Sequence, residues 1–177
     1  MFRSSFVLAI FCSLFVLVSE SALSQNSMSL LLRGNTLTVD SLEHEHDLSE
    51  VDIIVINLYG DTATHRSGSG GTYNMRLPFN DLFLLCYHKP GYSRKSILID
   101  TQSISKRLAK NGYQLEIDIL MVPSEEPEQE QECKPVAIAD YHYIKNEMIF
   151  NKIEDYEKML SQLEEWQSEA LKEREEY

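Results

Sequence analysis

Residues 113–121, YQLEIDILM, decide the fold, because Leu115, Ile117, Ile119 and Met121 recur at every second position. Successive side chains of a β-strand point to opposite faces of the sheet, so these four apolar side chains share one face. The same alternation recurs in two earlier stretches, as Tyr73, Met75 and Leu77 and as Phe83, Leu85 and Tyr87. A sheet with one buried face is the structure that this pattern predicts.

Short apolar segments of the same kind run from residue 29 to residue 121 and are separated by turn residues. They predict six strands, over residues 29–39, 52–59, 62–67 continuing after a glycine turn through 72–77, 82–88, 94–100 and 113–121. A seventh strand is expected through Val136 and Ile138. In the second strand we assign Ile54, Ile56 and Leu58 to the core face. The chain is therefore predicted to be a mainly β protein whose two antiparallel sheets enclose the core.

The glycine-rich stretch 67–71, SGSGG, provides the backbone freedom that a chain reversal needs. A phosphate-binding loop is the alternative interpretation of such a stretch. It is not favoured here, because no Lys followed by Ser or Thr comes after the glycines and the next element is a strand. Lys89, Pro90 and Gly91 form a second turn signal.

The N-terminus, residues 1–24, has the layout of a secretory signal peptide: Arg3, then an apolar run over residues 6–18, then a short polar stretch. Ala22 and Ser24 are the small residues that a signal peptidase requires, so cleavage would leave Gln25 at the N-terminus. A membrane anchor is the alternative. The apolar run would rise only about 20 Å as a helix, against a hydrocarbon core of about 30 Å, so no direct membrane insertion is expected after cleavage.

The charge of the chain is −12 at pH 7, which excludes nucleic acid as an expected partner. The acidity is concentrated toward the C-terminus. Residues 124–133, SEEPEQEQEC, hold five glutamates and no base, and residues 152–177 hold nine acidic and four basic residues. The first of these segments is expected to be an exposed acidic loop of the domain formed by residues 25–150.

Two cysteines, Cys86 and Cys133, remain after removal of the signal peptide. Disulfides persist in extracytoplasmic compartments, so these cysteines can pair and tie the acidic loop to a strand. Two free thiols are the alternative, and the sequence leaves both open.

The last segment, residues 151–177, changes from strand to helix periodicity. Its apolar residues recur at intervals of three and four, at Ile153, Tyr156, Met159, Leu160, Leu163, Trp166 and Ala170. This pattern predicts an acidic amphipathic helix. Its apolar stripe either packs on one sheet of the sandwich or binds a partner. Exposure of Trp166 to solvent would favour the second alternative.

Five segments resemble the carboxypeptidase regulatory-like (transthyretin-like) domain of exported Gram-negative envelope proteins: residues 32–36 (LRGNT), 54–59 (IVINLY), 71–78 (GTYNMRLP), 87–92 (YHKPGY) and 95–101 (KSILIDT). The resemblance extends over about residues 30–156. It implies a seven-stranded antiparallel Greek-key sandwich of the transthyretin (prealbumin) type. This chain departs from the family pattern by an insertion over residues 41–50 and by a glycine in place of an acidic residue before Gly71.

Some transthyretin-like proteins are hydrolases of purine-breakdown intermediates, and their C-terminal Tyr-Arg-Gly-Ser signature is absent here. The chain also contains no nucleophile-elbow motif, and its paired carboxylates fall mainly in the acidic loop and the C-terminal helix. No enzymatic activity and no cofactor are therefore expected.

The inserted loop contains His44 and His46, which project to the same side of an extended segment. Such a pair can share a zinc or copper ion when a further ligand completes the site, here His65, His88 or His142. A solvated acidic loop is the alternative.

The leading expectation is an exported, non-catalytic module, in the periplasm or secreted, that binds a protein or glycan partner or builds envelope structure. Association with the outer membrane would then come through that partner. A periplasmic metal-binding protein that uses His44 and His46 is the alternative function.

Overall fold

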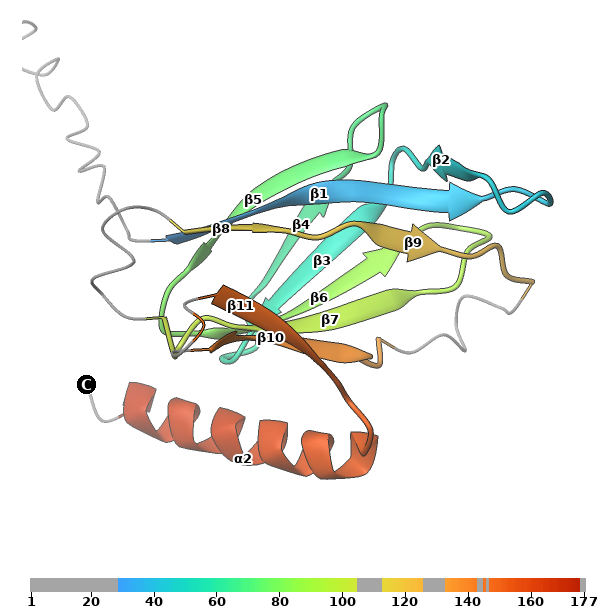
Figure 1. Cartoon of the computed structure of the whole chain (residues 1–177). Coiled ribbons are helices and arrows are strands. Elements are labelled where there is room, and N and C mark those ends of the chain that lie inside the picture. Colours follow the sequence, from blue (N-terminus) through green and yellow to red (C-terminus); the bar gives the residue numbers. More distant parts are fainter. Residues whose placement is uncertain (1–28, 105–112, 126–132, 143–144, 146, 176–177) are drawn as a thin grey trace, which may run out of the picture.

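The computed structural model describes residues 29–104, 113–125, 133–142, 145 and 147–175. Within these ranges the chain forms two facing β-sheets and one C-terminal helix (Figure 1). The predicted signal peptide, residues 1–24, and most of the predicted acidic loop lie outside the described residues.

The first sheet is built around β1 (Ser29–Val39). β1 pairs antiparallel with β2 (Glu45–Asp47) and with β5 (Thr72–Pro78). On its other edge β1 pairs parallel with β8 (Tyr113–Glu116) and β9 (Ile119–Met121). β1, the first strand predicted along the sequence, is thus the central strand of this sheet.

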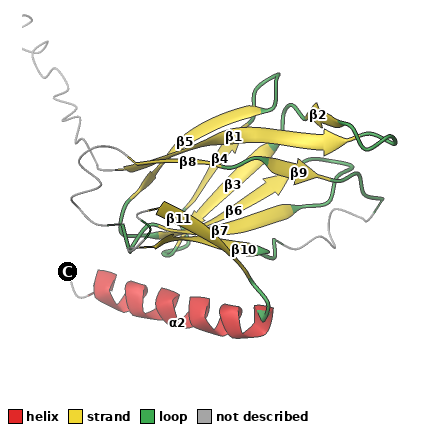
Figure 2. Cartoon of the chain, viewed as in Figure 1, coloured by secondary structure: helices red, strands yellow, loops and turns green. Residues whose placement is uncertain are grey.

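The second sheet has six strands (Figure 2). Their order across the sheet is β11 (Glu147–Lys152), β10 (Ala137–His142), β7 (Lys95–Asp100), β6 (Leu82–His88), β3 (Asp52–Asn57) and β4 (Thr62–Arg66). β10 runs parallel to β7, and the other neighbours are antiparallel.

The core lies between the two sheets, as the alternation predicts. Tyr73, Met75 and Leu77 of the first sheet and Phe83, Leu85 and Tyr87 of the second are all buried in it, together with Leu115, Ile117, Ile119 and Met121. At about 25 cal/mol per Å² of apolar area, these side chains provide the main stabilisation of the fold.

The core face predicted for β3 is wrong. Ile53 and Val55 are buried in the core, whereas Ile54, Ile56 and Leu58 are half-buried on the other side. Residues 53–56 are all apolar, so alternation could not fix which face points inward. Both faces of this strand are covered.

The prediction of seven antiparallel strands is also wrong, because both sheets are mixed and eleven strands lie within the described ranges. The glycine-rich turn does not continue one strand but lets the chain leave β4 in one sheet and enter β5 in the other. The predicted strand over residues 113–121 is divided into β8 and β9 where the Asp118 carboxylate accepts the backbone N–H of Asn35 at 2.7 Å. The inserted loop adds β2, and β11 completes a hairpin with β10.

The helix α2 (Tyr156–Glu175) begins where Asp155 caps it, since the Asp155 carboxylate accepts the backbone N–H of Lys158 at 3.0 Å. It lies against the outer face of the six-stranded sheet, away from the core (Figure 1). Tyr156, Met159, Leu160 and Leu163 are only half-buried. Within the described part of the chain, no helix combines the length and apolar character needed to cross a membrane.

Candidate binding surface

A small cavity separates α2 from the outer face of the six-stranded sheet. It has a volume of about 130 Å³ and is lined by Ile56, Asn57, Leu58, Leu82, Leu84, Leu98, Leu163 and Gln167. Its floor is apolar because β3, β6 and β7 carry aliphatic side chains on both faces. Leu163 and Gln167 of the helix form the opposite wall. α2 therefore covers this face without filling the space beneath it.

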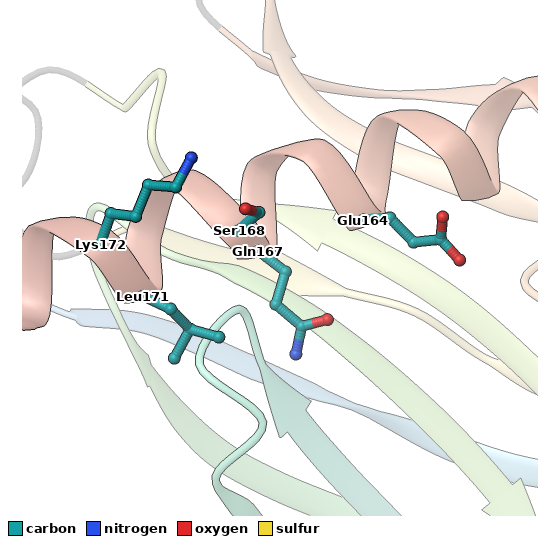
Figure 3. A pocket seen from close by; sticks show the side chains of 5 residues that line it. All are labelled: Glu164, Gln167, Ser168, Leu171 and Lys172. Atoms are coloured by element: carbon teal, nitrogen blue, oxygen red, sulfur yellow. The ribbon is translucent and has the colours of Figure 1, made fainter.

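A larger pocket of about 390 Å³ continues along α2 and shares Gln167 with the first. Its lining residues are Glu164, Gln167, Ser168, Leu171 and Lys172, so apolar and charged groups lie side by side (Figure 3). In that view Gln167 and Leu171 project from one side of the helix and Lys172 from the other. We call this pocket, together with Trp166, the helix surface.

Two large apolar side chains of the helix surface are exposed to solvent. Trp166 is 38% exposed and Leu171 is 42% exposed. Glu164, Glu165 and Glu169 are also exposed on this helix, and Lys172 lies beside Leu171 in the pocket. An exposed tryptophan within an acidic field is suited to contact with an apolar and basic partner surface.

A disulfide joins Cys86 of β6 to Cys133 at the lead-in to β10, with their Cα atoms 5.8 Å apart. Cys86 is 1% exposed and Cys133 is half-buried. The backbone N–H of Val136 donates to the carbonyl of Ser96 at 3.1 Å, so this segment lies along β7 next to β6. Of the two alternatives left open by the sequence, the structure contains the paired cysteines.

The inserted loop brings His44 and His46 to one carboxylate. Nδ1 of His44 lies 3.5 Å and Nε2 of His46 lies 3.0 Å from Oδ2 of Asp40. The hydrogen bond from His46, with a second from the backbone N–H of His44, lowers the pKa of Asp40 to about 2. Asp40 is the first residue after β1, and nothing in the sequence indicated that it lies beside the two histidines.

The histidines that would complete a metal site lie elsewhere. His65 is in the exposed edge strand β4, Nδ1 of His88 accepts a hydrogen bond from Arg94 at 3.3 Å, and Nδ1 of His142 accepts one from the backbone N–H of Lys145 at 3.2 Å. Among the residues that the structure describes, no three metal-ligating side chains are grouped so as to hold an ion. The metal site at His44 and His46 stays a prediction.

Two tyrosines inside the core form a hydrogen-bonded chain. The hydroxyl of Tyr87 donates to that of Tyr73 at 3.1 Å, and Tyr73 donates to the backbone carbonyl of Ile117 at 2.6 Å. Burial raises the pKa of Tyr73 to about 12 and the pKa of Tyr87 well above 10. Because the chain ends on a backbone carbonyl between the sheets, it holds β5, β6 and the β8–β9 junction together.

One carboxyl group outside the predicted acidic segments has a raised pKa. Burial raises the pKa of Asp100 at the end of β7, and the negative charge of Asp140 adds to the effect, while the backbone N–H of Gln102 opposes it. The sequence offered no signal for this pair, since it depends on the parallel pairing of β7 and β10.

No protein-family model and no curated protein sequence matches the chain. Solved structures of similar shape include 3-chlorocatechol 1,2-dioxygenase from Rhodococcus opacus 1CP, at TM-score 0.38 and 10% identity, with 54% of this chain and 60% of that one covered. Catechol 1,2-dioxygenase from Acinetobacter sp. ADP1 gives TM-score 0.39 and 10% identity, with 56% and 54% covered. The wild-type enzyme from Acinetobacter radioresistens gives 0.37 and 12%, with 59% and 55% covered.

These comparisons overturn the expectation that the chain is not an enzyme, because the proteins they name are enzymes. That expectation is not retained. The chain spans little more than half of the length of these structures. At this level the likeness concerns the β-sandwich fold, and it assigns neither an activity nor a site to this chain.

Proposed function

We propose that the chain is an exported β-sandwich module that binds a protein partner at the cell envelope through its helix surface. One observation carries the proposal: α2 presents both Trp166 and Leu171 to solvent, and Leu171 lines an open pocket of about 390 Å³. A helix that served only to cover the sheet would turn its largest apolar side chains inward.

The charge around this surface favours a basic partner. Six described acidic residues in and just before α2 are exposed, namely Glu154, Asp155, Glu157, Glu164, Glu165 and Glu169, and the sequence of residues 152–177 carries a net charge of −5. Opposite charges accelerate encounter and fix orientation, while buried aromatic anchors provide most of the affinity. Binding should therefore weaken as salt is added.

Export is supported by two independent features of the chain. Residues 1–24 have the layout of a signal peptide, and the Cys86–Cys133 disulfide is of the kind that persists in oxidising compartments. Mass spectrometry of the protein from its native host would identify Gln25 as the first residue of the mature chain. An intact N-terminus would contradict export.

The proposed family is the carboxypeptidase regulatory-like, transthyretin-type sandwich with its Greek-key topology. The two facing sheets support this proposal, as does the turn after β6, where Gly91 has φ +80° and the backbone N–H of Tyr92 donates to the carbonyl of Lys89.

The experiment compares capture of envelope proteins by the mature chain and by variants. Trp166→Ala combined with Leu171→Ala should reduce recovery of a specific partner at least tenfold, which corresponds to the loss of one anchor. Leu42→Ala is the matched control, because Leu42 is 72% exposed but lies in the β1–β2 turn. Equal recovery by the double variant and the parent would refute the helix surface as the contact site.

The alternative function, metal binding at His44 and His46, is decided by a separate titration. Micromolar or tighter binding of zinc or copper that is lost in both His44→Ala and His46→Ala would establish it. Binding that survives either change would exclude this loop as the site.

A further inference from the structure

The disulfide lies outside the core that holds the sandwich together. Cys86 alternates with Leu85 and Tyr87 along β6, so its side chain points away from the inner face that these two residues occupy. Cys86 is 1% exposed, and its bond to Cys133 lies on the outer side of the sheet. Cleavage of this bond would remove no side chain from between the two sheets.

The segment that begins at Cys133 contacts the start of the helix through Lys134 and Val136, and we call these two residues the seat of the helix. The carbonyl of Val136 accepts the backbone N–H of Ile153 at 3.1 Å, three residues before α2. The ammonium group of Lys134 lies 5.5 Å from the centre of the Tyr156 ring, the first residue of α2. Both the approach to the helix and its first turn therefore contact the residues that directly follow the disulfide.

Beyond this seat, the apolar residues of α2 that face the sheet, Met159, Leu160 and Leu163, are only half-buried in the described part of the helix. Leu163 and Gln167 border a cavity of about 130 Å³ instead of packing tightly on β6 and β7. We propose that the Cys86–Cys133 disulfide is a redox latch: its reduction frees the segment at Lys134, loosens α2 and uncovers the apolar outer face at Leu84 and Leu98, while the sandwich stays folded.

Opening the latch requires a dithiol as reductant. A thiolate of the dithiol attacks Sγ of Cys133, which is half-buried, whereas Cys86 is 1% exposed. The S–S bond breaks, and the Cys86 sulfur leaves with the electron pair and takes a proton. The second thiol then attacks the mixed disulfide, so that Cys133 is released as a thiol. Two electrons and two protons pass to the protein, and the dithiol becomes a disulfide.

The test is hydrogen exchange of the mature chain, measured by mass spectrometry with and without dithiothreitol. The mature chain contains only these two cysteines, so the reagent acts on one bond. We expect amide exchange in α2 to become at least tenfold faster on reduction, while exchange in β1 and β6 changes less than threefold. Unchanged exchange in α2 would overturn the latch, and so would a joint rise in α2, β1 and β6, which would make the bond a general staple of the fold.

Two variants separate the latch from other effects of the reagent. In Cys133→Ser, the amides of α2 should exchange as fast as in the reduced parent before any reductant is added. If this variant does not fold, the reduced parent provides the same state. Tyr156→Ala, in the oxidised protein, removes the contact with Lys134 and should speed exchange in the first turns of α2 without touching the disulfide. Slow exchange of α2 in both variants would show that the seat does not hold the helix.

Discussion

The backbone carbonyl of Ile117 occupies the space that a side chain on residue 34 would need, so a Cβ built on Gly34 collides with it. The same carbonyl accepts the Tyr73 hydroxyl, and the Ile117 N–H donates to the carbonyl of Arg33 at 2.9 Å. Gly34→Ala must push β1 away from the β8–β9 junction. We expect a loss of about 3 kcal/mol in the free energy of unfolding, measured by urea denaturation.

Gly68→Ala is the matched control for this substitution. A Cβ on Gly68 would lie 3.5 Å from its nearest neighbour, the Oγ1 of Thr72, which is an ordinary contact. We expect a change within about 1 kcal/mol. Equal destabilisation by the two substitutions would show that the close approach at Ile117 is not the cause.

Thr36 and Thr38, on the same strand, should respond in opposite ways to replacement by valine. The hydroxyl of Thr36 is buried against the carbonyl of Gly71, at 3.0 Å, and the hydroxyl of Ser67, at 3.2 Å. Thr36→Val leaves these groups with fewer partners and should cost about 1–3 kcal/mol. The Oγ1 of Thr38 is buried with no hydrogen-bond partner among the described residues, so Thr38→Val should be neutral or stabilising. Urea denaturation of both variants checks the pair, and a larger loss at position 38 would contradict it.

The core tyrosines predict a loss of stability in alkali. Because the pKa of Tyr73 is raised to about 12 and that of Tyr87 lies well above 10, their contribution is complete below pH 10 and is lost as the pH rises toward 12. Ultraviolet titration should find Tyr73 and Tyr87 still protonated at about pH 11 in the folded protein. Tyrosinate absorbance from all nine tyrosines at that pH, with the fold intact, would contradict the buried pair.

Replacement of these tyrosines by phenylalanine should give unequal losses. Tyr73→Phe removes the bond to Ile117 and leaves the Tyr87 hydroxyl without its acceptor, which should cost about 2 kcal/mol. Tyr87→Phe removes only the outer bond of the chain and should cost about 1 kcal/mol. Thermal or urea unfolding measures which variant loses more stability. A larger loss in Tyr87→Phe would mean that the hydrogen-bonded series does not end on the Ile117 carbonyl.

The Asp40 cluster predicts an unusually acidic carboxyl group. Because its pKa is lowered to about 2, its contribution to stability is present above its ordinary pKa of 3.8 and is lost as the pH falls through 2. Carbon-detected NMR should follow this titration, and His46→Ala should move the pKa toward 3.8. His44→Ala keeps the backbone N–H that donates to Asp40 and should move the pKa less. An unchanged pKa in His46→Ala would contradict the assigned cause.

Much of the fold could be predicted from the sequence, because strands with one buried face show alternating apolar and polar residues. The predicted and observed strands agree at Ser29–Val39 and Leu82–His88, and the core faces of β5, β6 and the β8–β9 stretch were correct. The face of β3 was missed because its apolar side chains cover both sides. The parallel pairings of β1 and β10 were missed because pairing partners distant in sequence leave no local signal.

The candidate surface was predictable only in part. The helix period and Trp166 pointed to α2, but the small cavity at Leu163 and Gln167 depends on how α2 lies over β3, β6 and β7. The cysteines were visible as a pair of residues, whereas the seat formed by Lys134 and Val136 required the folded arrangement. For the histidine loop, the sequence located His44 and His46 but not Asp40, which approaches them through the β1–β2 turn.

The central claim, that the helix surface is where this module binds its partner, is tested most directly by photo-crosslinking in the native host. A photoreactive amino acid placed at residue 166 should give a discrete adduct with one basic envelope protein, and the same group at residue 42 should not. The adduct should be lost when Leu171→Ala is added. Equal adducts from both positions, or adducts from residue 42 alone, would contradict the account.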